Sequence, residues 1–511
     1  MTTLYRNARV HAPGPPATAL AVDGGTIVWL GTGEVAADEA VDLGGAFVAP
    51  AFVDAHVHTT ATGLMLTQLD LHACRSVRDV LDAVEAVARR SGGRPILGTG
   101  WDESSWPERR PPTAAELDRA SYGGVVYLSR ADVHGAVASS ALLALAPVAG
   151  LAGDEGGGLV RLDAHHAVRR VALASLTPSQ VADAQRAALA EAARLGIGSV
   201  HEMSGPEVAG EDDLRSLLAL DTGVEVVAYW GELGAVDRAL ALGARGPGGD
   251  LFCDGSIGSW TACFHDPYAD DPARSGSLRF TVEEVEAHVR DCVEAGVQTG
   301  FHVIGDRAVD TVVEAFERVG RDRVAAGRHR LEHVEAASPE TVSRMAALGL
   351  VASVQPAFDA AWGGPSGMYA DRLGAERAAG LNPYAAFGAA GVPMAFGSDA
   401  PVTALDPWGG VRAAVRHGTS GSAVSPRAAF LAATRGGHRA AGDDESGVLA
   451  VGAPATFAVW DAEPLPPRPV DERVAGWSTD AGWPEAGLPD VSETPECLRT
   501  VVRGRVVWNR S

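Results

Sequence analysis

Apolar residues along the central part of the chain recur with a helical period and then give way to short continuous apolar runs. Thr281 opens a capping-box pattern, and helical spacing continues until Gly296, through Val282, Val285, Val289 and Cys292. Ser338, which is followed by a proline, and Gly349 bound a second such helix, and an apolar run follows it at 351–355. Repetition of a helix that leads into a buried strand predicts a parallel α/β fold.

Short apolar runs of this kind number eight between residues 52 and 397, and we interpret each as one strand of a parallel barrel. Eight parallel strands predict a (β/α)8 TIM barrel, whose functional groups lie at the carboxyl ends of its strands. We assign this barrel to residues 49–444. The runs lie at 52–57, 198–201, 224–229, 251–253, 299–303, 330–332, 351–355 and 394–397.

Both ends of the chain show β-like runs separated by turn residues, and this pattern predicts a flanking β-sandwich from residues 1–48 and 445–511. The first two barrel strands are separated by a connection far longer than an ordinary βα loop. It contains apolar runs of its own at 95–99 and 125–129. We interpret residues of about 64–180 as an inserted α/β subdomain over the barrel mouth.

Charge and composition narrow the class of partner. The formal net charge of −23 argues against nucleic acid or an anionic membrane surface. No apolar run is long enough to span a bilayer, and no export signal opens the chain. The five cysteines are scattered without a paired motif, as expected in a reducing cytoplasm. We therefore expect a cytoplasmic protein with a small-molecule substrate, and a homodimer is one alternative for its oligomeric state.

Candidate chemistry lies at the ends of the apolar runs. His56 and His58 are two residues apart, so in a strand their side chains lie on the same face and can chelate one ion. An ordinary hydrogen-bonding role explains such a pair equally well. However, His302, His333 and Asp399 end three further runs in the same way. Four such endings in one chain favour a metal site.

With these motifs the chain resembles the amidohydrolase superfamily, specifically amidohydrolase family 3, which includes N-substituted formamide deformylase-like and YtcJ-like hydrolases. The resemblance covers nearly the whole chain and rests on six motifs. These are Phe52-Val53-Asp54-Ala55-His56-Val57-His58, Gly100-Trp101-Asp102, Cys253-Asp254-Gly255-Ser256-Ile257-Gly258-Ser259, His302-Val303-Ile304-Gly305-Asp306-Arg307-Ala308-Val309, Leu331-Glu332-His333 and Gly397-Ser398-Asp399-Ala400-Pro401-Val402.

The resemblance implies a divalent metal, usually zinc, and a metal-activated water that attacks an amide-type or ring C–N bond. Asp399 would accept the proton of that water, and His333 would either ligate or polarise the substrate oxygen. The candidate metal ligands are therefore His56, His58, His302, His333 and Asp399. Imidazoles and a carboxylate are ligands that suit zinc.

One residue type that the resemblance calls for is missing. Many members of the family carry a lysine four residues before the aspartate of the Asp254-Gly255-Ser256 motif, and its carbamate can bridge two ions. This chain contains no lysine, and Asp250 occupies that position. Because an aspartate side chain is much shorter, we expect one ion rather than two. Glu202 or Asp254 could supply a carboxylate instead, and both are equally explained as structural hydrogen-bonding residues.

The inserted segment supplies candidates for the wall of the substrate pocket, namely Trp101, Arg130 and His134. Packing of the insertion itself explains these residues as well. An aromatic lining favours a largely apolar amide or N-formyl substrate. The alternatives are a deaminase of an amidine-like heterocycle and a catalytically idle, metal-stabilised barrel that binds a small molecule.

Overall fold

The computed structural model describes residues 1–33, 35–103, 106–130, 135–463 and 488–510. The chain divides into two compact units, of which one comprises residues 1–59 and 189–511 and the other residues 60–188. None of the described helices is both long and apolar enough to cross a membrane.

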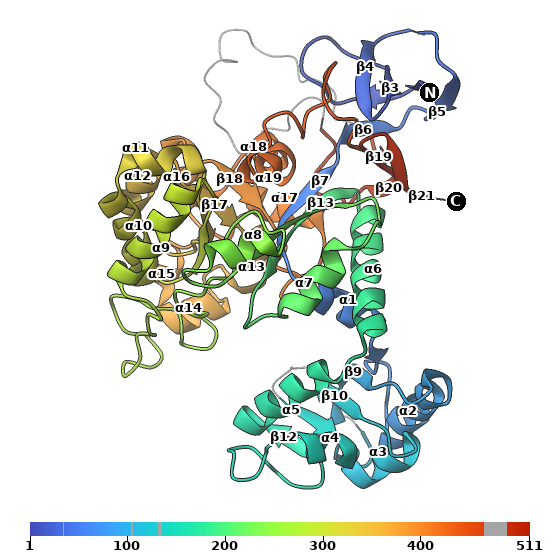
Figure 1. The fold of residues 1–511 in the computed structure, drawn as a ribbon, viewed down its shortest axis with the longest axis vertical. Helices are drawn as coiled ribbons and strands as arrows, with labels where there is room; N and C mark the ends of the chain where they lie inside the picture. Colours follow the sequence, from blue (N-terminus) through green and yellow to red (C-terminus); the bar gives the residue numbers. More distant parts are fainter. Residues whose placement is uncertain (34, 104–105, 131–134, 464–487, 511) are drawn as a thin grey trace. The chain divides into compact units, whose positions relative to one another are not determined.

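The first unit contains two sheets of parallel strands in a TIM-barrel-like α/β fold, and helices lie beside them (Figure 1). One sheet has the order β14-β13-β7, and a second has the order β15-β16-β17-β18. A parallel bridge between Val57 and Ala400 joins β7 to the residues after β18. The strands are β7 (Phe52–Val57), β13 (Ile197–Ser204), β14 (Glu225–Trp230), β15 (Gly300–Val303), β16 (Arg330–His333), β17 (Val351–Val354) and β18 (Met394–Phe396).

The run predicted at 251–253 occupies the fourth strand position without forming a regular strand. It pairs with β15 through a parallel bridge between Phe252 and His302. The amide of Cys253 donates to the carbonyl of His302 at 3.0 Å. On the other side, β14 bonds to residues 246–248 instead, because Trp230 exchanges hydrogen bonds with Gly246 and Gly248. Residues 246–248 therefore pair with β14, and residues 252–253, a few positions later, pair with β15.

Helices follow the barrel strands as the apolar spacing predicts. Thr281 and Glu284 form both hydrogen bonds of a capping box, and Gly296 ends the helix with φ 68°. Ser338 caps the next predicted helix, and Gly349 ends it. The helices of this part are α7 (Glu211–Leu218), α8 (Val236–Ala241), α9 (Val282–Ala295), α10 (Asp306–Val319), α11 (Arg321–Val324), α12 (Pro339–Leu348), α13 (Pro356–Trp362), α14 (Met368–Leu373), α15 (Ala375–Ala378), α16 (Tyr384–Ala390), α17 (Pro407–Val415), α18 (Pro426–Leu431) and α19 (Gly437–Ala440).

An aromatic cluster fixes the start of β7, the strand that carries the two paired histidines. Phe52 is buried, with its ring centroid 5.1 Å from that of Trp408, 5.4 Å from Phe430 and 5.7 Å from Trp460. The three contacts are edge-to-face, which is a favourable geometry for aromatic pairs. This packing anchors β7 below its functional end.

Residues near the two chain ends form two further sheets, and one of these sheets combines strands from both ends. Their orders are β4-β3-β1-β5 and β2-β6-β19-β20-β21. Tyr5, Leu20, Val48, Phe457 and Val501 belong to one buried apolar cluster. The strands are β1 (Thr3–Arg6), β2 (Arg9–Val10), β3 (Ala19–Asp23), β4 (Thr26–Gly31), β5 (Glu39–Asp42), β6 (Phe47–Pro50), β19 (Phe457–Asp461), β20 (Glu496–Val502) and β21 (Arg505–Asn509).

The second unit has a mixed sheet of its own, with the order β12-β11-β10-β9-β8. Its apolar core includes Trp101, Trp106 and Leu128. The elements are β8 (Leu69–Asp70), β9 (Ile96–Trp101), β10 (Val126–Arg130), β11 (Gly135–Ala138), β12 (Leu159–Arg161), α2 (Val77–Ser91), α3 (Ala114–Ala120), α4 (Ser140–Leu145), α5 (Leu162–Ala174) and α6 (Pro178–Arg194), and α1 (Thr59–Thr67) leads into them.

Candidate metal centre

Six side chains that can bind a metal meet at the carboxyl ends of the barrel strands. They include all five ligands expected from the sequence, together with Asp250. Three overlapping groups have their ligand atoms within 4.8 Å of one another, and these groups are His56/His58/Asp250, His56/His333/Asp399 and Asp250/His302/His333. All six residues are buried except His58, which is partly exposed.

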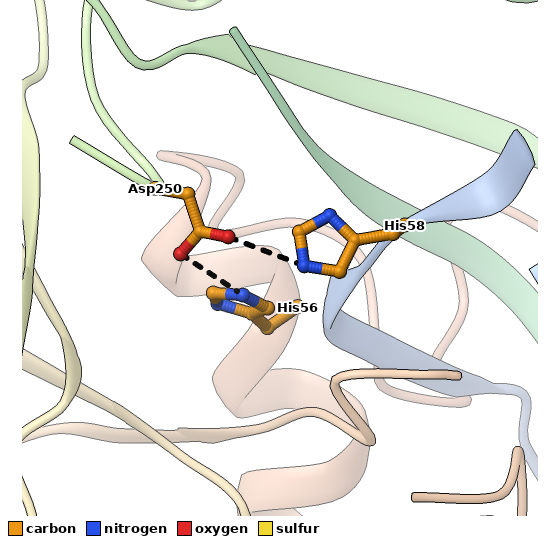
Figure 2. Close-up of side chains that lie close together, drawn as sticks. All are labelled: His56, His58 and Asp250. Carbon is orange, nitrogen blue, oxygen red and sulfur yellow. Dashed lines mark ion pairs between the residues drawn. The ribbon is translucent and has the colours of Figure 1, made fainter. Parts of the chain in front are cut away.

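Asp250 lies among the four histidines. Its Oδ2 is 3.2 Å from Nε2 of His58, and its Oδ1 is 3.5 Å from Nε2 of His56 (Figure 2). The same Oδ1 is 3.4 Å from Nδ1 of His302 and 3.7 Å from Nε2 of His333. The expectation that this side chain is too short to reach across the site is therefore wrong.

Each histidine uses one ring nitrogen for a hydrogen bond directed away from the cluster. In a neutral ring, an acceptor of this kind keeps the proton on that nitrogen, so the other nitrogen is left to bind a metal at the centre. The pairs are His56 Nδ1 with Glu332 Oε2 at 2.9 Å, His58 Nδ1 with the Met203 carbonyl at 3.1 Å, His302 Nε2 with the Gly255 carbonyl at 3.2 Å and His333 Nδ1 with Gln355 Oε1 at 2.8 Å.

The hydrogen bond of His333 bears on the two roles expected for this residue. Its Nδ1 is 2.8 Å from Oε1 of Gln355, and burial lowers the pKa of the ring. With the proton on Nδ1, the inward Nε2 can bind a metal but cannot donate to a substrate oxygen. This geometry suits a ligand, and both roles stay predictions.

The donor set fits a divalent cation. Four buried atoms that face the centre have no hydrogen-bond partner among the described residues, namely His56 Nε2, His302 Nδ1, Asp250 Oδ1 and Asp399 Oδ1. With bonds of about 2.1 Å, two ligands of one tetrahedral zinc ion lie about 3.4 Å apart. The nitrogen-to-oxygen distances given above for Asp250 fall around this value, and all except the 3.2 Å to His58 exceed normal hydrogen-bond lengths.

The electrostatics of the cluster also suit a cation. Burial opposes the charged form of His56, but the carboxylates of Asp250 and Asp399 outweigh it and raise the pKa of His56 to about 10. Burial raises the pKa of Asp250, whereas the histidines, His56 foremost, lower it to well below its usual range. Two carboxylates thus stay ionised inside the protein, and a metal ion can balance their charge.

The backbone is strained where it presents two of the ligands. His333 has φ 67° and Asp399 has φ 55°, in the left-handed region that side chains other than glycine seldom adopt. The amide of Asp399 donates to the carbonyl of His56 at 2.8 Å, and Ser398 is fixed by two hydrogen bonds to the carboxylate of Asp54. Such strain persists only where the surroundings enforce it, as at functional sites.

The hydrogen-bond partner of His56, Glu332, belongs to a buried ion pair. Arg330 and Glu332 are fully buried in β16, and Nε of Arg330 donates to Glu332 Oε1 at 2.8 Å. Arg330 also donates to the Ala55 carbonyl and to Ser353 Oγ. Glu332 therefore remains charged while it accepts from His56. Sequence analysis gave these two residues no role, although alternate charges in an otherwise apolar strand are a signal of a buried pair.

Glu202 and Asp254, the other two carboxylates considered as substitutes for the missing lysine, accept hydrogen bonds from backbone amides. Glu202 Oε2 accepts from the amide of Thr59 at 2.7 Å. Asp254 accepts from three amides, those of Cys263, Ile304 and Gly305. Burial raises the pKa of each carboxyl to about 6. Of the three candidates, only Asp250 belongs to the groups of ligand atoms that the described residues form.

The residues expected in the substrate-pocket wall lie in the second unit. Trp101 is buried in the core of that unit, and its Nε1 donates to the carbonyl of Leu128. Arg130 pairs with Asp102 at 3.0 Å and with Glu103 at 2.9 Å. His134 lies outside the described residues. Packing within its own unit accounts for Trp101.

Within the first unit, aromatic residues adjoin the metal cluster directly. The ring of Phe358 stacks on His333, with centroids 5.9 Å apart and an interplanar angle of 9°. Trp362 packs on Phe358 at 4.9 Å. Trp362 in turn packs against a buried apolar cluster that includes Ile257, Ile304 and Tyr369. Aromatic side chains therefore adjoin the cluster beside His333.

The sequence of this chain is similar to those of known proteins. The model of the Amidohydro_3 amidohydrolase family matches residues 39–508. YtcJ of Bacillus subtilis (strain 168), which is named as an amidohydrolase, is 29% identical over 414 residues that span 75% of each chain. N-substituted formamide deformylase of Arthrobacter pascens is 25% identical over 89% of this chain and 92% of its own.

A solved structure agrees with these relatives. An uncharacterised metal-dependent hydrolase from Pyrococcus furiosus superposes with a TM-score of 0.77 and 26% sequence identity, over 91% of this chain and 99% of its own. The family match covers far more than half of the chain. The chain belongs to the amidohydrolase family.

Proposed function

We propose that the protein is a metal-dependent hydrolase that cleaves a non-peptide C–N bond in a small, largely apolar amide or N-formyl compound. The observation that carries this proposal is the cluster of four histidines and two aspartates at the barrel mouth, in which every histidine turns one ring nitrogen inward. Zinc suits these ligands, and other divalent ions accept the same set.

A divalent ion at such a site polarises a carbonyl oxygen and lowers the pKa of a bound water to about 7. Asp399 acts as the general base. Burial raises the pKa of Asp399, but the neighbouring histidines lower this pKa by a larger amount. The carboxylate is therefore ionised and can take a proton from the attacking water. Asp399 then returns this proton to the leaving nitrogen.

The surroundings of the site support a neutral substrate. Phe358 and Trp362 offer apolar area beside His333. Arg130 is occupied by Asp102 and Glu103, and Arg372 pairs with Asp270. The name of the Arthrobacter relative points the same way, because an N-substituted formamide is an uncharged amide.

A comparison of two substrates tests this proposal. We expect kcat/KM for N-benzylformamide to exceed that for its ring-carboxylated analogue by about ten- to a hundredfold, because a buried carboxylate without a partner is costly. Formate release is the measurement. A preference for the carboxylated compound that disappears in Arg130→Ala would contradict the apolar pocket. Ammonia release from an amidine-like heterocycle would favour a deaminase, and no turnover with any added divalent metal would indicate a binding barrel.

Removal of metal provides a second prediction. Dialysis against a chelator should abolish formate release and lower the thermal midpoint, because bound metal stabilises the folded chain by about 3 to 4 kcal/mol at 100 to 1,000 times its Kd. Addition of Zn²⁺ or Mn²⁺ should restore both properties. Activity that survives complete metal removal, as verified by elemental analysis, would be incompatible with the proposal.

A further inference from the structure

We infer that Asp250 bridges two divalent ions and so takes the place of the lysine carbamate that this chain cannot form. The inference rests on the metal centre of the proposed function and extends it to the number of ions and the identity of the bridge. It replaces the expectation of a single ion, which depended on the supposed short reach of Asp250.

The first argument is the division of the ligands into groups. Asp250 belongs both to the group with His56 and His58 and to the group with His302 and His333. Among the described residues, no group of mutually close ligand atoms contains His58 together with His302 or His333. One ion therefore cannot serve all four histidines.

The two carboxylate oxygens face different histidines. Oδ2 is 3.2 Å from Nε2 of His58, whereas Oδ1 is 3.4 Å from Nδ1 of His302, 3.7 Å from Nε2 of His333 and 3.5 Å from Nε2 of His56. These separations are close to the distance of about 3.4 Å between two ligands of one tetrahedral ion. The carboxylate of Asp250 therefore has ligand partners on both sides.

Asp399 completes the first group. Its Oδ1 is 3.1 Å from Nε2 of His58 and 3.6 Å from Nε2 of His56. The first ion then has His56, His58, Asp399 and Asp250 as ligands. The second has His302, His333 and Asp250, which leaves a position open for water or substrate, as catalytic sites require.

An aspartate can reach the centre because the chain around it packs closely. A Cβ on Gly231, just after β14, would lie 2.5 Å from the carbonyl oxygen of Asp250, and a Cβ on Gly248 would lie 2.4 Å from the amide nitrogen of Gly300. Only glycine allows these approaches. The backbone before Asp250 is thereby held tightly against the ends of β14 and β15.

The test uses the metal and no substrate. Full-length protein is stripped with a chelator, reloaded with Mn²⁺ and analysed for metal content and by electron paramagnetic resonance. We expect two ions per chain and the spectrum of an exchange-coupled pair, because ions that share a carboxylate lie within about 4 Å of each other. Saturation at one ion per chain, or two ions without coupling, would overturn the inference.

Variants then identify the bridge. Asp250→Asn should lower the content from two ions to one or fewer and abolish the coupling. The matched control is Glu202→Gln, which alters a buried carboxylate at a strand end outside the metal groups and should keep two coupled ions. A coupled pair that persists in Asp250→Asn would refute the bridge. Should that variant not fold, the wild-type spectrum alone still decides whether a coupled pair exists.

The outcomes separate this inference from the proposed function. A coupled pair without hydrolysis of any amide would contradict only the proposed function. Hydrolysis of N-benzylformamide by a chain that saturates at one ion would contradict only the bridge. Neither measurement depends on the result of the other.

Discussion

Asp399→Asn should lower kcat by about two to four orders of magnitude even when the metal content of the variant is restored, because asparagine cannot accept a proton from water. The wild-type carboxylate is buried and ionised, with Oδ1 3.1 Å from Nε2 of His58. Asparagine keeps the shape and an oxygen that can ligate. The measurement is kcat for N-benzylformamide, with elemental analysis of the same sample.

Metal content distinguishes the two roles of this residue. If Asp399 served only as a ligand, activity and metal content would fall together, and added zinc would restore both. A fully loaded variant that remains slow supports the role of general base. Recovery of wild-type kcat on addition of zinc would reject that role.

Arg330→Met should destabilise the protein by about 3 to 5 kcal/mol, because it leaves the carboxylate of Glu332 buried without its cation. Arg330 is fully buried, donates to Glu332 at 2.8 Å and lies over the ring of Tyr229 at 4.7 Å. Methionine fills much of the same volume but supplies no charge. Chemical denaturation, followed by tryptophan fluorescence and circular dichroism, measures the loss.

Two further variants control for the substitution itself. Arg318→Met removes an arginine that pairs with Glu283 and Glu314 on the surface, and we expect a change below about 1 kcal/mol. Arg330→Met combined with Glu332→Gln should recover part of the loss, since the stranded charge is gone. Equal effects of Arg330→Met and Arg318→Met would show that the buried pair is not important for stability.

The barrel strands could be predicted from sequence because parallel strands buried on both faces are continuous apolar runs. The run at 52–57 coincides with β7, and the run at 351–355 ends one residue beyond β17. The run at 251–253 was harder to assign as a strand. It does not pair with β14, because β14 forms hydrogen bonds with Gly246 and Gly248 instead. Such a choice is made by tertiary packing and not by local pattern.

The sequence indicated five of the six side chains that meet at the candidate site, but not that Asp250 lies among them. Histidines and aspartates at strand ends can be recognised in a sequence, because they end apolar runs. The reach of Asp250 depends on how closely its backbone approaches β14, which side-chain length alone does not reveal. The sequence also left open whether Trp101 lines a pocket or packs in the insertion, and its indole packs in the core of its own unit. Aromatic residues serve cores and pockets equally well.

The position of Asp250 has a consequence for how the centre is assembled in the cell. A carbamate forms only after translation, when an amine captures dissolved carbon dioxide, and it is lost again when that gas is scarce or the pH falls. A carboxylate that is encoded in the chain is present as soon as the barrel folds. A centre built on Asp250 therefore matures at a pace set by metal supply alone, independent of how much bicarbonate the surroundings contain.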